Sequence, residues 1–73
     1  MSEYEQFMRE KLKLDGYVSQ KFRIIRVRED LSGSWLDLEH PGGETASLHL
    51  ETANARKYFV SILIQQDQDH TLA

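Results

Sequence analysis

Apolar residues near the amino terminus recur with the period of a helix. They occupy the i, i+3, i+4 and i+8 positions that share one helical face, and they are Tyr4, Phe7, Met8 and Leu12. Ser2 followed by Glu5 is the pattern of a capping box, which satisfies two unpaired amides where a helix begins. Asp15 and Gly16 supply a stop signal. The pattern therefore predicts a helix over about residues 3–14.

After Tyr17 the period changes to that of strands. The stretch YVSQKFRIIRVRE is rich in aromatic and β-branched residues, and its alternation slips by one residue at Ile24 and Ile25. Such a slip indicates either a β-bulge or a strand that is partly buried on both faces. Two later segments, WLDLE and TASLHL, alternate strictly and are predicted to be strands. Their inward-facing residues are expected to be Leu36, Leu38, Ala46, Leu48 and Leu50.

The segment between these two strands, His40 to Gly43, has the composition of a tight turn. Pro41 fixes φ at the first corner position, and Gly42 can adopt the positive φ that the second corner of a type II turn requires. Gly43 is then free to form a bulge. A phosphate-binding glycine loop would open onto a helix N-terminus, whereas this loop opens onto a strand. The sequence therefore predicts a hairpin and not an anion site.

The last segment, ETANARKYFVSILIQQDQD, can be interpreted in two ways. Its stretch YFVSILI would suit a buried strand, but the run from Ala53 to Asp69 contains no glycine or proline and is long for a strand. We therefore predict a helix, with Thr52 as its N-cap and residues 67–73 as a frayed tail. If residues 55–65 were instead a strand, the fold would be a small β-barrel-like domain.

The predicted order is helix, three-stranded antiparallel sheet, helix, with both helices on one face of the sheet, which is an α+β fold. Residues 1–73 form a single small domain. A core of this size supplies little net stability, and the chain contains no cysteine for disulfides or a zinc site. Self-association is the remaining common way to stabilise so small a domain.

Basic residues are concentrated in residues 9–28. This segment contains seven of the nine lysines and arginines against Glu10 and Asp15 alone, a formal charge of +5, while the remainder has two basic and ten acidic residues, a charge of −8. Such segregation can mark a nucleic-acid-binding face. It also arises where neighbouring strands pair opposite charges.

The expected hairpins gather aromatic and charged side chains on the sheet face away from the helices. Pairing of Arg28 with Trp35 places Arg26 opposite Asp37, and the second hairpin places Trp35 beside His49. A tryptophan on a solvated surface can stack on a base, a peptide or an aromatic ligand. A possible ligand or nucleic-acid surface thus consists of Arg26, Arg28, Trp35 and His49. The structural alternative is a tryptophan packed on neighbouring Arg and His side chains.

The element order resembles that of the double-stranded RNA-binding domain, in topology alone. That family contacts phosphates largely through a lysine-rich start of its second helix, and the matching stretch TANARKY offers Arg56 and Lys57, with Glu51 adjacent. A net charge of −3 opposes such binding, because phosphate neutralisation supplies most non-specific affinity for nucleic acid. Nucleic-acid binding through the basic first strand and Trp35 is therefore the alternative function.

Residue types used in catalysis and metal binding occur, but not in the arrangements that these sites require. Asp37, Ser47 and His49 include the types of a hydrolytic triad, yet on regular strands they lie in a row and do not converge on a cleft. Glu39, His40 and His49 could contribute metal ligands, but the sequence has no cysteine and no closely spaced histidine pair. We therefore expect no enzymatic activity, no metal site and no cofactor.

The last predicted helix has more apolar surface than a small sheet can cover. Beyond its core stripe, Tyr58, Val60 and Ile64 widen the apolar arc to roughly 240°, and exposed patches of this kind usually mark interfaces. We expect these three residues to bind a partner, either a second copy or a larger protein. The predicted function is a small non-catalytic protein-interaction or regulatory module, unless the first helix covers this stripe.

No part of the sequence approaches the length of apolar run that a membrane span needs. We therefore expect no membrane partner, and a cytoplasmic location.

Overall fold

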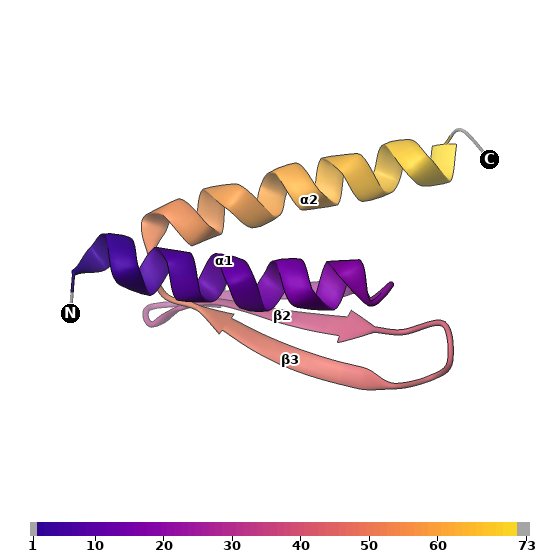
Figure 1. Cartoon of the computed structure of the whole chain (residues 1–73), viewed down its shortest axis with the longest axis horizontal. Coiled ribbons are helices and arrows are strands. Elements are labelled where there is room, and N and C mark those ends of the chain that lie inside the picture. The colour runs from indigo at the N-terminus through magenta and orange to yellow at the C-terminus, as the bar shows by residue number, and fades with distance from the viewer. Residues whose placement is uncertain (1, 72–73) are drawn as a thin grey trace.

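The computed structural model describes residues 2–71 and has the predicted α+β architecture. The elements, in order, are α1 (Glu3–Ser19), β1 (Arg23–Asp30), β2 (Gly33–Glu39), β3 (Thr45–Leu50) and α2 (Ala53–Thr71). The three strands form one antiparallel sheet in the order β1-β2-β3, and both helices lie on the same side of it (Figure 1). The strand alternative for residues 55–65 is wrong. Helix α2 continues through residues 67–71, where we expected fraying, and residues 72 and 73 lie outside the described part.

Helix α1 continues well past its predicted end at residue 14, so the interpretation of Gly16 as a stop was wrong. Its C-terminus is closed by Lys21, which has a left-handed φ of 76°. The amide of Phe22 donates to the carbonyl of Tyr17 and that of Lys21 to the carbonyl of Val18, both at 3.0 Å. The rings of Tyr17 and Phe22 pack edge to face at 5.1 Å. This is a Schellman motif with its apolar contact, and it needs no glycine at residue 16.

The buried face of α1 also differs from the predicted stripe. Tyr4 and Leu12 are 67% and 63% exposed, whereas Leu14 is fully buried. Phe7 packs against the core, and one turn later Glu10 is only 7% exposed. A pattern of apolar residues alone misplaces this face, because one of its central positions is a carboxylate.

The two hairpins have the predicted registers. Arg28 lies opposite Trp35, Arg26 opposite Asp37, and the register shifts between Ile24 and Arg26. Of the two interpretations of the slipped alternation at Ile24 and Ile25, this shift in register agrees with the β-bulge. In the second hairpin the pairing is regular from Ser34↔Leu50 to Glu39↔Thr45.

The turn between β2 and β3 is a hairpin, but its geometry differs from the prediction. Gly43 has the positive φ, 99°, and Gly42 does not, which excludes a type II turn. The amide of Gly43 donates to the carbonyl of His40 at 2.8 Å, and the amide of His40 donates to the carbonyl of Glu44 at 2.8 Å. The His40 ring accepts from the Gly42 amide at 2.9 Å. This bond makes His40 a structural residue of the turn.

Gly33, which opens β2, is the glycine that the fold needs most. Its φ is 133°, and a Cβ placed there would lie 2.3 Å from the carbonyl oxygen of Leu50. The close approach lets β2 pair with Leu50 of β3 directly beside the first turn.

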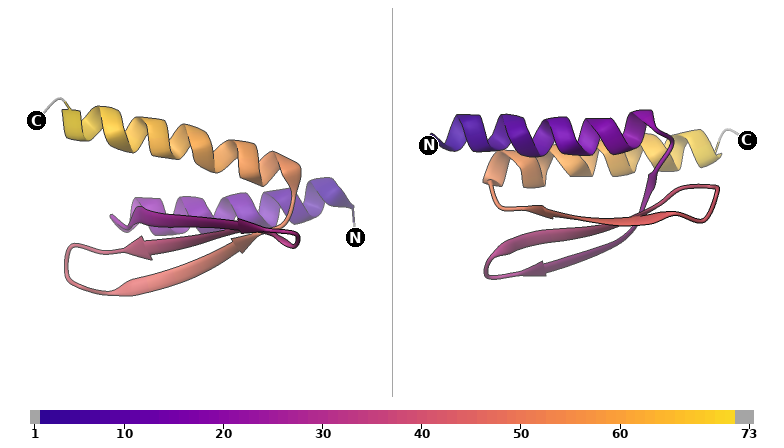
Figure 2. Two further views of the ribbon diagram at one scale, coloured as in Figure 1. Left: turned by 180° about the vertical axis from the view of Figure 1, so that it is seen from behind. Right: turned by 60° about the horizontal axis from the view of Figure 1, so that its bottom comes forward.

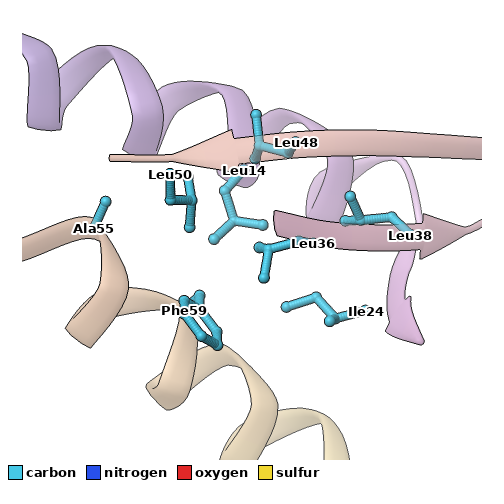
Figure 3. Close-up of a cluster of buried hydrophobic side chains, with 8 residues drawn as sticks. All are labelled: Leu14, Ile24, Leu36, Leu38, Leu48, Leu50, Ala55 and Phe59. Atoms are coloured by element: carbon cyan, nitrogen blue, oxygen red, sulfur yellow. The ribbon is translucent and has the colours of Figure 1, made fainter. Parts of the chain in front are cut away.

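The core lies between the sheet and the two helices. Its leucines come from α1, β2 and β3, while α2 contributes Ala55 and Phe59 (Figure 3). The buried apolar residues are Leu14, Ile24, Leu36, Leu38, Leu48, Leu50, Ala55 and Phe59. Each large side chain contributes about 1.5–3 kcal/mol through removal from water.

A buried carboxylate of α1 fixes the start of α2. Glu10 accepts hydrogen bonds from the amide of Glu51 at 2.9 Å and from the amide and hydroxyl of Thr52 at 3.1 and 2.8 Å. The Thr52 hydroxyl oxygen accepts from the amide of Ala55 at 3.1 Å, which confirms the predicted N-cap. Burial raises the pKa of Glu10, but these hydrogen bonds outweigh it and hold the pKa below its ordinary value.

Candidate functional site

The outer face of the sheet brings together the predicted aromatic pair. The rings of Trp35 and His49 stack in parallel, with centroids 4.0 Å apart and planes within 5°. The indole N–H donates to the carboxylate of Asp30 at 3.2 Å, and His49 Nε2 lies 2.9 Å from the carbonyl oxygen of Ser32. Hydrogen bonds from Ser32 hold the pKa of Asp30 below its ordinary value. Trp35 is therefore packed and hydrogen-bonded within the chain.

The arginines of this face have acidic neighbours. Arg28 lies 3.6 Å from the carboxylate of Asp37, and Arg26 is opposite Asp37 in the register. Cross-strand pairing thus explains part of the charge segregation without a ligand. The Ser47 hydroxyl donates to Asp37 at 3.2 Å instead of to His49. In a hydrolytic triad the serine bonds to the histidine, so these three residues do not have the contacts of a triad.

The stretch that matches the phosphate-binding helix start is partly neutralised. The Arg56 guanidinium forms an ion pair with Glu29 of β1 at 3.0 Å. Lys57, the only other cation in the stretch, is exposed on α2.

Across residues 2–68, the part whose side chains the structure describes, no group of three His, Asp or Glu side chains is placed to hold a metal ion. Within residues 2–71, neither helix has the length and apolar character needed to cross a bilayer.

The three residues predicted to bind a partner divide between two sides of α2. The Tyr58 hydroxyl donates to the Asp15 carboxylate of α1, and the Lys11 ammonium lies 4.9 Å from the centre of the Tyr58 ring. The hydrogen bond to Asp15, together with burial, raises the pKa of Tyr58 above its ordinary value. The premise that the molecule leaves Tyr58 uncovered was therefore wrong, because Tyr58 holds the two helices together.

Val60 and Ile64 lie on the other side of α2 and are 45% and 55% exposed. This side adjoins β1, because Arg56, one turn before Val60 on the same side of α2, pairs with Glu29 of β1 at 3.0 Å. Ile25, in the bulge, is 57% exposed. We call Ile25, Val60 and Ile64 the α2–β1 flank; helix α2 runs above β1 in the left view of Figure 2.

A groove that the sequence did not predict lies on the opposite side of the molecule, between α1 and β3. Its volume is about 470 Å³, and its lining residues are Leu12, Lys13, Gly16, Tyr17, Gln20, Ser47 and Leu48. We call it the α1–β3 groove. Gly16 was the available signal, because a glycine inside a helix often has a packing or functional reason.

Comparisons with known proteins add no assignment: no family model, curated protein or solved structure matches this chain. The surfaces of the molecule are therefore the basis on which a function can be proposed.

Proposed function

We propose that this chain is a small non-catalytic protein-interaction module that self-associates through the α2–β1 flank. The observation that carries the proposal is the exposure of Val60 and Ile64, 45% and 55%, one helical turn apart on α2. Two aliphatic side chains at i and i+4 form a continuous strip along a helix. Such a strip is stabilised when a partner removes it from water.

The strip is also suited to a two-fold contact. If two α2 helices pack antiparallel, Val60 of one copy meets Ile64 of the other, and the reciprocal contact forms at the same time. Ile25 would extend the apolar surface toward the sheet. Because only three aliphatic side chains are involved, we expect a weak, concentration-dependent dimer and not an obligate one.

Nucleic-acid binding, the alternative function, receives less support from the outer face of the sheet and the start of α2. Trp35 is stacked on His49, Arg28 is close to Asp37, and Arg56 pairs with Glu29. Groups that are already paired must lose those contacts before they can bind a base or a phosphate.

Sedimentation velocity across protein concentrations from micromolar to millimolar tests the proposal. We expect the weight-average mass to rise toward that of a dimer as concentration increases. The double variant Val60→Glu, Ile64→Glu should weaken the association about tenfold or more, because it replaces two buried aliphatic contacts with charges.

The matched control is Leu31→Glu, which changes an aliphatic side chain that is fully exposed in the β1–β2 turn. This variant should associate like the unmodified chain. A strictly monomeric unmodified protein at millimolar concentration would rule out the dimer, and equal effects of both variants would rule out this surface.

A further inference from the structure

We propose that β3 and the α1–β3 groove bind an extended, acidic peptide segment of another protein, which adds to the sheet as a fourth strand. The groove lies on the opposite side of the molecule from the α2–β1 flank, and peptide binding there does not depend on self-association. Three features favour it: the open edge of β3, the charge beside that edge and the composition of the groove.

Within residues 2–71, strand β3 has a free outer edge. In that part of the chain the sheet order β1-β2-β3 leaves it with a strand on one side only, and its pairing with β2 is regular over residues 45–50. Its sequence, TASLHL, contains no proline and no lysine, arginine, aspartate or glutamate. An uncharged, unbulged edge is the kind of edge that accepts another strand, because its outward amides and carbonyls continue the ladder.

The groove beside this edge can hold the side chains of an added strand. Leu12, Tyr17 and Leu48 provide apolar walls, and Gln20 provides a hydrogen-bonding side chain. Side chains of a strand alternate between two faces, so every second residue of the guest would point toward α1 and this groove.

The charge of the groove selects an acidic guest. Lys13 lines it, and Arg9 lies one turn earlier on the same side of α1 and is exposed. Among the described residues, neither side chain takes part in an ion pair, whereas Lys11, on the side of α1 that faces α2, is paired with Asp15 at 2.8 Å. A carboxylate on the guest strand would supply the missing counter-charge.

A second copy of this chain fits the groove less well. Two-fold pairing of β3 with its own copy would bring Lys13 and Arg9 of each α1 toward the same residues of the other. Like charges across an interface disfavour that pairing. We therefore assign the groove to a partner of opposite charge.

Gly16 provides an independent indication that the groove has a use. A Cβ at this position meets no atom within 4 Å, and its φ is not positive, so the fold itself does not require glycine there. A glycine inside a helix costs about 0.5–1 kcal/mol relative to alanine. Its absent side chain leaves room for a guest chain to approach α1.

The test is a selection from a displayed library of random peptides about ten residues long, enough for one strand. We expect enrichment of peptides that carry Asp or Glu, lack proline and are rich in β-formers. Amide chemical shifts recorded with one enriched peptide should change at Thr45, Ser47 and His49, and near Lys13.

Two variants examine the charge and the edge separately. Lys13→Glu should lower the affinity for the enriched peptide about three- to tenfold, because one favourable charge pair becomes a repulsive one. Lys57→Glu, the same change on exposed α2, is the matched control and should leave binding unaltered. Ser47→Pro removes an amide at the centre of the edge strand and should abolish binding.

Gly16→Gln separates binding from folding. It should raise the unfolding temperature, because glutamine favours a helix, and weaken peptide binding at least about threefold, because its side chain fills the groove. A merely structural Gly16 would leave binding unchanged. The proposal is overturned if no peptide is enriched more strongly than in a parallel selection on the Ser47→Pro variant, or if basic peptides bind as tightly as acidic ones. It is also overturned if the chemical shifts of β3 change with protein concentration and not with added peptide.

Discussion

The two edges of the sheet differ in how they are protected. Strand β1 contains five charged residues among eight, has a bulge at Ile25, and is capped by Gln66, whose side-chain amide also donates to the carbonyl of Ile24 at 2.9 Å. Strand β3 has no charged residue and no bulge. Charges, bulges and covering groups are the usual devices that prevent strands from pairing between molecules. Because the chain applies all three to β1, their absence from β3 indicates an edge that can be used.

The comparison also explains why the helices have different surfaces. Helix α2 approaches β1 at both ends of the strand, through Gln66 at Ile24 and through Arg56 at Glu29. Its side chains are therefore committed to the β1 edge, and Val60 and Ile64 remain on its outer side. Helix α1 leaves the β3 edge open and borders a groove instead.

The largest expected loss of stability is at Gly33, which closes the β1–β2 ladder opposite Asp30 and directly precedes the first pair of the β2–β3 ladder. Gly33→Ala should reduce the free energy of unfolding by about 3–5 kcal/mol, since the new Cβ would collide with the carbonyl of Leu50. Urea denaturation measures this. Gly43→Ala is the control, because its φ of 99° is also left-handed but a Cβ there meets no atom within 4 Å. It should cost only about 1–2 kcal/mol, and equal losses would disprove the clash.

A smaller loss of folding stability is expected when the start of α2 is released from α1. Glu10→Ala leaves the amides of Glu51 and Thr52 without their acceptor and should cost about 2–3 kcal/mol. Hydrogen exchange should then accelerate along β1 more than along β3, because α2 bonds directly to β1 through Gln66 and Arg56. Arg9→Ala, at an exposed position of the same helix, is the control and should change stability by about 0.5 kcal/mol or less.

The same carboxylate predicts a dependence on pH. Because the folded state holds the pKa of Glu10 below its ordinary value, its stabilisation is complete above the ordinary glutamate pKa and is lost as pH falls through the lower folded-state pKa. Glu10→Gln should therefore flatten the decline of stability in acid. An unchanged acid slope would show that Glu10 contributes nothing to it.

The smallest effect tests the edge comparison directly. Gln66→Ala removes the two hydrogen bonds to the Ile24 backbone and should cost about 1–2 kcal/mol. It should also accelerate hydrogen exchange of the Ile24 amide, because the β1 edge then lacks its covering group, as the β3 edge does. The neighbouring Gln65→Ala, at an exposed position, should do neither.

Much of the fold could be predicted because strands and registers depend on local alternation. Strict alternation in WLDLE and TASLHL placed the second hairpin, and the slipped alternation at Ile24 and Ile25 located the bulge. Helix α2 was favoured over a strand by the length of its uninterrupted run.

The errors arose where tertiary contacts override local signals. Gly16 looked like a helix stop, but the contact of Tyr17 with Phe22 lets Lys21 close the helix instead. Glu10 and Gln66 are polar residues whose backbone partners lie 41 or more positions away, so no local pattern identifies their roles. The open β3 edge likewise becomes visible only when the strand order is known.

The stack of Trp35 on His49 gives the molecule an optical reporter. Trp35 is the only tryptophan, and its ring lies 4.0 Å from an imidazole carried by β3. Indole emission responds to what lies against the ring, so any displacement of β3 would alter the fluorescence of the unlabelled protein. Occupation of that strand can thus be followed at high dilution without an added dye.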